Sequence, residues 1–268
     1  MKIKTYQEQI NYIEAFKKRF ISLLIFQGRG GTGKSYNVER LLEGENYIMF
    51  KGHSTPLSIY QRCLKNPNAL VVFDDVDALL NNKTAVALLK QLCDTKEEKK
   101  VYYSTTSKLD GEEIPKEFIS RNKVLLLCNS YIGTNDDLKA VLTRGFYFHF
   151  EPTNEEVFKA LSKFATDKQL LKEFEKNLYK IPNFNFRLYE KALQLKEAKL
   201  DYNLYLRETY NLSTDDDVLR DVEKLPREEG LKIWRNKTGL SERSFYRKLK
   251  ELKLNALACT DIKKVVKK

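Results

Sequence analysis

Short apolar runs and helix-like stretches alternate along the first 150 residues of the chain. Over residues 5–20, Ile10, Ile13 and either Phe16 or Phe20 recur at the spacing of one helix face. Continuous apolar strands separated by helices predict a parallel sheet that helices cover on both faces. The predicted strands of this α/β core are Leu23–Gln27, Tyr47–Phe50, Leu70–Asp74, Val124–Cys128 and Phe146–Phe150.

After Pro152 the apolar spacing is only helical, which predicts helices over residues 154–165, 168–179, 185–199 and 200–211. The acidic stretch Ser213–Asp217 is interpreted as a linker or a helix cap, and a last basic helical unit is expected from Pro226 onward. A further strand or hairpin is predicted at Val101–Thr106. The expected organisation is an α/β core over 1–152, an all-helical lid over 153–212 and a basic helical unit over 213–268.

Composition places the chain among globular proteins. Its 268 residues are 42% apolar and 32% charged, enough for one sizeable core and a smaller second unit. The first long apolar run, Ile21–Phe26, is too short for a secretory signal or a membrane span, so we expect a cytoplasmic protein without a membrane partner. Cysteines 63, 93, 128 and 259 show no metal-binding spacing and are expected to be ordinary thiols in a reducing compartment.

Positive charge is concentrated near the C-terminal end. The net charge is +11, and residues 222–268 contain 14 Lys and Arg against 6 Asp and Glu. The preceding residues contain 34 against 31. Such a segment is either a solvated helical surface or a site for phosphate backbones, and a motif is needed to choose between them.

The strongest motif is GRGGTGKS, which matches G-x-x-x-x-G-K-[ST] without a mismatch. It follows a predicted strand and opens a predicted helix, where glycines let successive backbone N–H groups face phosphates. Lys34 is expected to reach the β- and γ-phosphates of ATP, and Ser35 to bind Mg²⁺. The expected nucleotide-binding residues are Gly28, Arg29, Gly30, Gly31, Thr32, Gly33, Lys34 and Ser35.

A second motif, ALVVFDDVDALL, is an apolar strand that ends in two carboxylates about forty residues later. Asp74 is expected to hold Mg²⁺ through its water shell, and Asp75 to polarise the attacking water. The alternative is that these acids cap the following helix, an explanation that suits Asp77 better than Asp74.

Three further short segments, each with one polar or basic residue at a defined place, follow along the chain. KVLLLCNS places Asn129 at the end of an apolar strand, LKAVLTRGFYFHFEP places Arg144 just before the fifth strand, and NFNFRLYEKAL places Arg187 at a helix start. Each has an ordinary structural explanation: a turn former for Asn129, a helix C-terminus for Arg144, and a solvated cation for Arg187.

Taken together, this order of motifs resembles the AAA+ ATPase superfamily over roughly residues 20–200, most of all compact AAA+ proteins of phages and mobile elements. The resemblance implies a Mg·ATP-dependent ATPase that forms a ring or helical homo-oligomer with shared sites. It assigns Asn129 to sensor one, Arg144 to the arginine finger, with Arg121 as its competitor, and Arg187 to sensor two. Asp75 departs from the glutamate usual in the superfamily, and its shorter reach implies slower hydrolysis.

TGLSERSFYRKLKEL, residues 238–252, has a helix-turn-helix signature and resembles the Fis-type unit of bacterial DNA-binding proteins. Gly239 is expected to make the turn and Ser241 to cap the second helix. Arg235 departs from the small residue expected four positions before the glycine, which leaves a purely structural helical hairpin as the alternative. The residues expected to contact DNA are Arg243, Tyr246, Arg247, Lys248 and Lys250.

These features favour an ATP-hydrolysing oligomer that acts on DNA in phage or mobile-element replication, as a helicase loader or initiator, with a replicative helicase as a candidate partner. The alternatives are an ATP-controlled DNA-binding switch of the transposition type and a small replicative helicase. His53 and His149 have no partners at metal-ligand or catalytic-triad spacing and are expected to be structural.

Overall fold

A computed structural model describes residues 1–75, 79–109, 112–129, 136–178, 181–210, 215–223 and 225–250. The chain divides into two compact units, Met1–Ala160 and Leu161–Lys268. Within the described ranges, no helix is long and apolar enough to cross a membrane.

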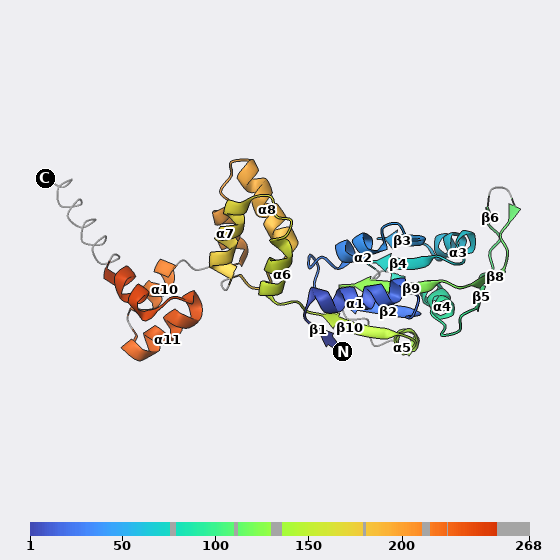
Figure 1. Cartoon of the computed structure of the whole chain (residues 1–268), viewed down its shortest axis with the longest axis horizontal. Helices are drawn as coiled ribbons and strands as arrows, with labels where there is room; N and C mark the ends of the chain where they lie inside the picture. Colours follow the sequence, from blue (N-terminus) through green and yellow to red (C-terminus); the bar gives the residue numbers. More distant parts are fainter. Residues whose placement is uncertain are drawn as a thin grey trace. The chain divides into compact units, whose positions relative to one another are not determined.

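The first unit is an α/β fold around a six-stranded parallel sheet, as the apolar pattern predicts. The strand order is β1-β10-β2-β9-β4-β3 (Figure 1). Its strands are β1 (Lys2–Ile3), β2 (Leu23–Gln27), β3 (Tyr47–Lys51), β4 (Leu70–Asp74), β9 (Lys123–Cys128) and β10 (Phe146–Phe150). Its helical elements are α1 (Tyr6–Lys17), α2 (Lys34–Leu42), α3 (Pro56–Lys65), η1 (Leu79–Asn81), α4 (Lys83–Leu92), α5 (Asp136–Leu142) and α6 (Asn154–Leu161), the last of which runs into the second unit.

Helices cover both faces of this sheet because its central strands are apolar on both faces. On one face, Ile25, Val71 and Leu126 form a buried cluster with residues of α3 and α4 such as Ile59 and Leu89. Alternate strand residues point to the other face, where α1 packs and the Tyr12 and Phe148 ring centroids lie 4.1 Å apart.

Between α4 and β9 the chain forms an antiparallel arm that extends past the sheet (Figure 1). The arm consists of β5 (Lys99–Tyr102), β6 (Lys108–Leu109), β7 (Glu112–Glu113) and β8 (Glu117–Ser120). The strand predicted at Val101–Thr106 is therefore present as β5, but it begins two residues earlier and ends at Tyr102. Its base is anchored by Val101 in the core and by Tyr60, whose ring stacks on Tyr103 and whose hydroxyl donates to the Pro115 carbonyl at 2.6 Å.

The second unit is helical, as predicted. It contains α7 (Lys168–Asn177), α8 (Phe186–Glu197), α9 (Tyr202–Tyr210), α10 (Asp215–Val222), α11 (Arg227–Thr238) and helical residues 242–250. The acidic stretch Ser213–Asp217 is interpreted from the sequence as a linker or a helix cap. Its residues 215–217 form the first turn of α10. Acidic side chains favour the N-terminal turn of a helix because they complement its dipole. The sequence pattern missed this helix.

Candidate nucleotide site and basic helical unit

The GRGGTGKS segment forms a loop between β2 and α2, as the motif predicts. Gly31 and Gly33 have φ of 75° and 78°, a left-handed conformation that favours glycine. A Cβ on Gly28 would lie 2.2 Å from the Phe150 carbonyl oxygen, so no side chain fits there. Gly33 is the N-cap of α2 and makes no side-chain hydrogen bond to it, and the N-terminus of a helix favours an anion.

Lys34 is almost fully buried, with 6% of its surface exposed. Its ammonium donates hydrogen bonds to the Gly28 carbonyl at 2.6 Å, the Arg29 carbonyl at 2.8 Å and Asn129 Oδ1 at 3.2 Å. The lysine is therefore held inside the loop, beside the asparagine predicted as sensor one.

The two acidic residues at the end of β4 have different partners. Ser35 Oγ donates to Asp74 Oδ1 at 2.8 Å, which brings the two predicted Mg²⁺ ligands together. Asn129 Nδ2 donates to Asp75 Oδ1 at 3.1 Å. Asp75 has a positive φ of 61°, and its backbone N–H donates to Leu127 on the neighbouring strand β9. The structure thus joins residues from two adjacent strands and the phosphate loop at one edge of the sheet.

The residue types at this edge suit Mg²⁺ and a nucleotide phosphate. Mg²⁺ in such sites takes one or two protein oxygens and completes its shell with water and phosphates. Within the described ranges, no three His, Cys, Asp or Glu side chains form a group that could hold a metal ion by themselves. The Ser35–Asp74 pair can supply the protein oxygens, and Lys34 with the α2 N-terminus can supply positive charge for phosphate.

Helix α1 supports the phosphate loop, a role that sequence reasoning missed. The Tyr6 hydroxyl donates to the Thr32 carbonyl at 2.7 Å, and burial raises the pKa of this phenol above its ordinary value. Gln9 accepts a hydrogen bond at 2.9 Å from Asn37 on α2. No motif indicates these contacts, because they join α1 to a loop residue and a helix residue that are distant from it in sequence.

The two finger candidates differ in their ion pairing. Arg121 forms an ion pair with Glu98. Arg144 is half-buried and donates to its own helix at Ala140 O, 2.6 Å away, and no described carboxylate lies within ion-pair distance of it. The turn after Arg144 is fixed, since a Cβ on Gly145 would lie 2.5 Å from Leu23.

In the second unit, α10, α11 and helical residues 242–250 share a small core. Trp234 is fully buried and meets Phe245 edge to face, with ring centroids 5.6 Å apart. The turn predicted at Gly239 is present, with a φ of 66°, and Ser241 Oγ accepts from the Ser244 N–H at 3.3 Å as the predicted cap. The core residues are Val218, Leu219, Val222, Trp234 and Phe245, with Leu231, Ile233, Leu240 and Leu249 packed against them.

The residues expected to contact DNA do not all have the same environment. Arg243, Tyr246, Arg247 and Lys250 lie on helical residues 242–250 with at least part of each side chain at the surface. Lys248 instead forms an ion pair with Asp215 at 2.8 Å, inside the unit.

The unexpected Arg235 does not obstruct helix packing, because it is exposed and pairs with Glu242 at 3.1 Å. Gly230 provides the close approach between helices, with its Cβ position 3.0 Å from the Val222 carbonyl oxygen. The small residue that lets the helices of this unit approach each other therefore stands five positions before Arg235.

The remaining residues singled out from the sequence are Arg187, His53 and His149. Arg187 lies in the first turn of α8 in the second unit, on its exposed side. His149 is a strand residue of β10 paired with Lys2 of β1, whereas His53 lies in an exposed loop after β3.

Comparison with known proteins gives only distant similarities. No protein-family model and no curated protein matches the chain. A structure of a RuvB mutant from Thermotoga maritima is 13% identical, with a TM-score of 0.45 over 88% of this chain and 83% of that chain. A structure of NtrX from Brucella abortus in complex with ADP is 13% identical, with a TM-score of 0.49 over 94% of this chain and 70% of that chain. These similarities are too low to support a function, so the assignment depends on the residues of this chain.

Proposed function

We propose that this protein binds and hydrolyses ATP with Mg²⁺ as an AAA+-type ATPase, and that it does so as a homo-oligomer acting on DNA. The observation that carries the proposal is the convergence of Lys34, Ser35, Asp74, Asp75 and Asn129 at one edge of the sheet. These are the five side chains that phosphate binding, metal binding and water activation require in P-loop ATPases.

Each residue has a distinct task in this proposal. Lys34 and the N-terminus of α2 hold the phosphates, and Ser35 and Asp74 hold Mg²⁺. Asp75 accepts a proton from the attacking water, and Asn129 orients Asp75 through the hydrogen bond at 3.1 Å. Because aspartate reaches less far than glutamate, we expect slow turnover in the absence of DNA or a partner.

Arg144 is the preferred arginine finger because its guanidinium has no carboxylate partner among the described residues. A cation that stabilises charge on the γ-phosphate of a neighbouring subunit must be available to that subunit. The ion pair of Arg121 with Glu98 would have to break first. Arg187 is proposed as the sensor-two residue on the basis of its position at the start of α8 alone.

DNA contact is assigned to the basic helical unit. Arg243, Arg247 and Lys250 follow at intervals of four and three residues, so they share one face of helical residues 242–250. Tyr246 lies beside them and is 39% exposed. A helix capped after a tight turn, with such a face, suits the major groove or a phosphate backbone. Within this function, we favour a helicase loader or initiator in phage or mobile-element replication.

The test of nucleotide binding compares two variants. Lys34→Ala should lose Mg·ATP binding, since the buried cation of the phosphate loop is removed. Asp75→Asn should keep binding and lose turnover, because the amide cannot accept the proton. Titration calorimetry and a phosphate-release assay measure the two effects. Equal ATP affinity for Lys34→Ala and the wild type would overturn the site.

The test of the DNA role is ATP turnover with and without single- and double-stranded DNA, together with the mass of the assembly. A monomer in the presence of ATP, with turnover that neither DNA changes, would refute an oligomer acting on DNA while leaving the nucleotide site intact.

A further inference from the structure

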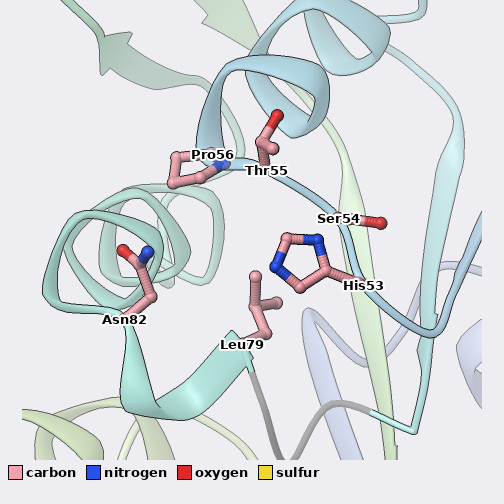
Figure 2. A pocket seen from close by; sticks show the side chains of 6 residues that line it. All are labelled: His53, Ser54, Thr55, Pro56, Leu79 and Asn82. Carbon is pink, nitrogen blue, oxygen red and sulfur yellow. The ribbon is translucent and has the colours of Figure 1, made fainter.

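The start of helix α2 is held differently from the starts of α3 and α4. Figure 2 shows Thr55 and Asn82 where α3 and α4 begin, and each side chain accepts a hydrogen bond from its own helix, at 3.2 Å and 3.0 Å. Such caps fix the first turn of a helix. Gly33, the N-cap of α2, makes no side-chain hydrogen bond to its helix. In α2, contacts from α1 take this place.

Two side chains of α1 reach the phosphate loop and the first turns of α2. Tyr6 and Gln9 lie three residues apart, so they share one side of α1. The Tyr6 hydroxyl donates to the Thr32 carbonyl at 2.7 Å. Gln9 Oε1 accepts from Asn37 Nδ2 at 2.9 Å, and the Asn37 backbone N–H donates to the Gly33 carbonyl at 3.1 Å. Helix α1 therefore holds the chain on both sides of Gly33.

Helix α1 is itself fixed to the sheet beside these contacts. The Tyr6 and Phe150 rings meet edge to face, with their centroids 5.3 Å apart. The Phe150 carbonyl oxygen lies so close to Gly28 that a Cβ there would be 2.2 Å from it. Arg29 donates to the Pro152 carbonyl at 3.1 Å. The phosphate loop is thus held between the end of β10 and the start of α1.

The contact between Gln9 and Asn37 is not explained by stability alone. Gln9 is fully buried, and its amide nitrogen has no hydrogen-bond partner among the described residues. Turning both amides would exchange donor and acceptor and still leave one polar atom of Gln9 without a partner. A buried unsatisfied polar group destabilises a fold, whereas apolar side chains of similar shape at both positions are nearly neutral or stabilising. What the polar pair adds is direction, because a hydrogen bond fixes how two helices are aligned.

We propose that Tyr6 and Gln9 are positioning residues for nucleotide binding: they hold the phosphate loop and the first turn of α2 in the conformation that accepts phosphate. This inference rests on the proposed nucleotide site and names what fixes its geometry. Without these contacts the loop adopts other conformations for part of the time. The measured affinity then falls in proportion to the fraction of molecules that can bind.

The first test removes one hydroxyl. Tyr6→Phe keeps the ring against Phe150 and loses the hydrogen bond to Thr32. The matched control is Tyr60→Phe, since Tyr60 is also buried and its hydroxyl donates to a backbone carbonyl, that of Pro115, at 2.6 Å. In calorimetric titrations, Tyr6→Phe should bind Mg·ATP about 3- to 10-fold more weakly than the wild type, the factor that one hydrogen bond is worth. Tyr60→Phe should bind it with wild-type affinity.

A second measurement on the same two variants needs no ligand. Amide hydrogen exchange over residues 30–37 of the nucleotide-free protein should be faster in Tyr6→Phe than in the wild type, and unchanged in Tyr60→Phe. Urea unfolding should show similar losses of stability for the two variants, because each loses one hydrogen bond of the same kind. Equal ATP affinity and equal exchange in the two variants would mean that Tyr6 contributes stability alone, and would overturn its positioning role.

The second test separates position from stability at Gln9. Gln9→Met combined with Asn37→Leu removes the unsatisfied nitrogen and its neighbour together and keeps the side-chain volumes similar. The double variant should unfold at the same urea concentration as the wild type or at a higher one, yet bind Mg·ATP about 3- to 10-fold more weakly. A double variant that binds ATP as tightly as the wild type would overturn the assignment of Gln9.

These outcomes are separable from a failure of the proposed function. If Mg·ATP binds neither to the wild type nor to Tyr60→Phe, the nucleotide site itself is refuted. If the wild type binds Mg·ATP, and Tyr6→Phe and the double variant bind it equally well, the positioning role is refuted and the nucleotide site stands.

Discussion

The arginine finger is the part of the proposed mechanism that a single substitution tests most sharply. Arg144→Ala removes a guanidinium whose described hydrogen bond is to its own helix, at Ala140 O. Loss of one such bond costs about 0.5–1.5 kcal/mol of folding free energy, so the variant should stay folded. An arginine finger contributes roughly 10³–10⁵ to turnover, or about 4–7 kcal/mol of transition-state stabilisation. The effect on hydrolysis should therefore far exceed the effect on stability.

Arg121→Ala is the matched control. Arg121 and Glu98 are both about half exposed, and an exposed ion pair is worth about 0.2–1 kcal/mol. This variant should hydrolyse ATP nearly as the wild type does. Steady-state phosphate release at saturating ATP, with ATP affinity measured in parallel, distinguishes a lost finger from lost binding.

Mixing subunits tests whether the site is shared. Arg144→Ala lacks the finger and Asp75→Asn lacks the proton acceptor, so some interfaces in a mixed oligomer pair an intact finger with an intact Asp75. Activity should return at intermediate ratios. The absence of rescue at every ratio would refute a shared site, and normal turnover of Arg144→Ala with slow turnover of Arg121→Ala would transfer the role to Arg121.

Three further predictions concern packing, pH and DNA. Gly28→Ala places a Cβ 2.2 Å from the Phe150 carbonyl oxygen, a backbone atom that cannot easily move away, and should lower the free energy of unfolding by about 3 kcal/mol in urea titrations. Gly44→Ala, at a φ of 82° with no atom within 4 Å, reports only the left-handed strain of about 1–2 kcal/mol, and an equal loss in both variants would contradict the steric argument. Burial lowers the pKa of Lys99 to about 8, so the unfolded chain binds more protons than the folded one between that pH and about 10.5. Stability should therefore rise with pH in this window by up to about 3 kcal/mol relative to Lys99→Met, and parallel pH curves would show that Lys99 is not desolvated. On duplex DNA, Arg243→Ala and Arg247→Ala should each reduce the slope of log binding constant against log salt concentration by about 0.9. Lys248→Ala should reduce this slope by less, because Asp215 already neutralises Lys248. An equal reduction for all three variants would show that the ion pair between Lys248 and Asp215 opens on DNA.

The sequence predicts the five longer strands of the central sheet well because each is a largely apolar run of five or six residues. Three of the five predicted strands, those beginning at Leu23, Leu70 and Phe146, have the predicted bounds. Strand β1 has only two residues, Lys2 and Ile3, which is too short for any periodicity to reveal. Strands β6 and β7 are equally short, and three of their four residues are charged.

The candidate site was predictable wherever its chemistry is local in sequence. The loop from Gly28 to Ser35 and the acids Asp74 and Asp75 follow from motifs of a few residues. The contacts that organise them do not, because Asn129 lies 95 residues from Lys34, and Arg29 donates at 3.1 Å to Pro152, 123 residues away. The pairing of β2 with β9 and β10 brings these side chains together.

The buried ammonium of Lys34 has a consequence for the thermodynamics of ligand binding. Its described oxygen partners, two carbonyls and the Asn129 side chain, are internal competitors for any phosphate. A phosphate oxygen that pairs with Lys34 replaces at least one of them, so the measured affinity reflects an exchange of hydrogen bonds rather than a simple gain. If Asn129 is the partner replaced, its amide can turn with Asp75 still bound, so that loading of the phosphate loop is communicated directly to the carboxylate that we propose as the proton acceptor.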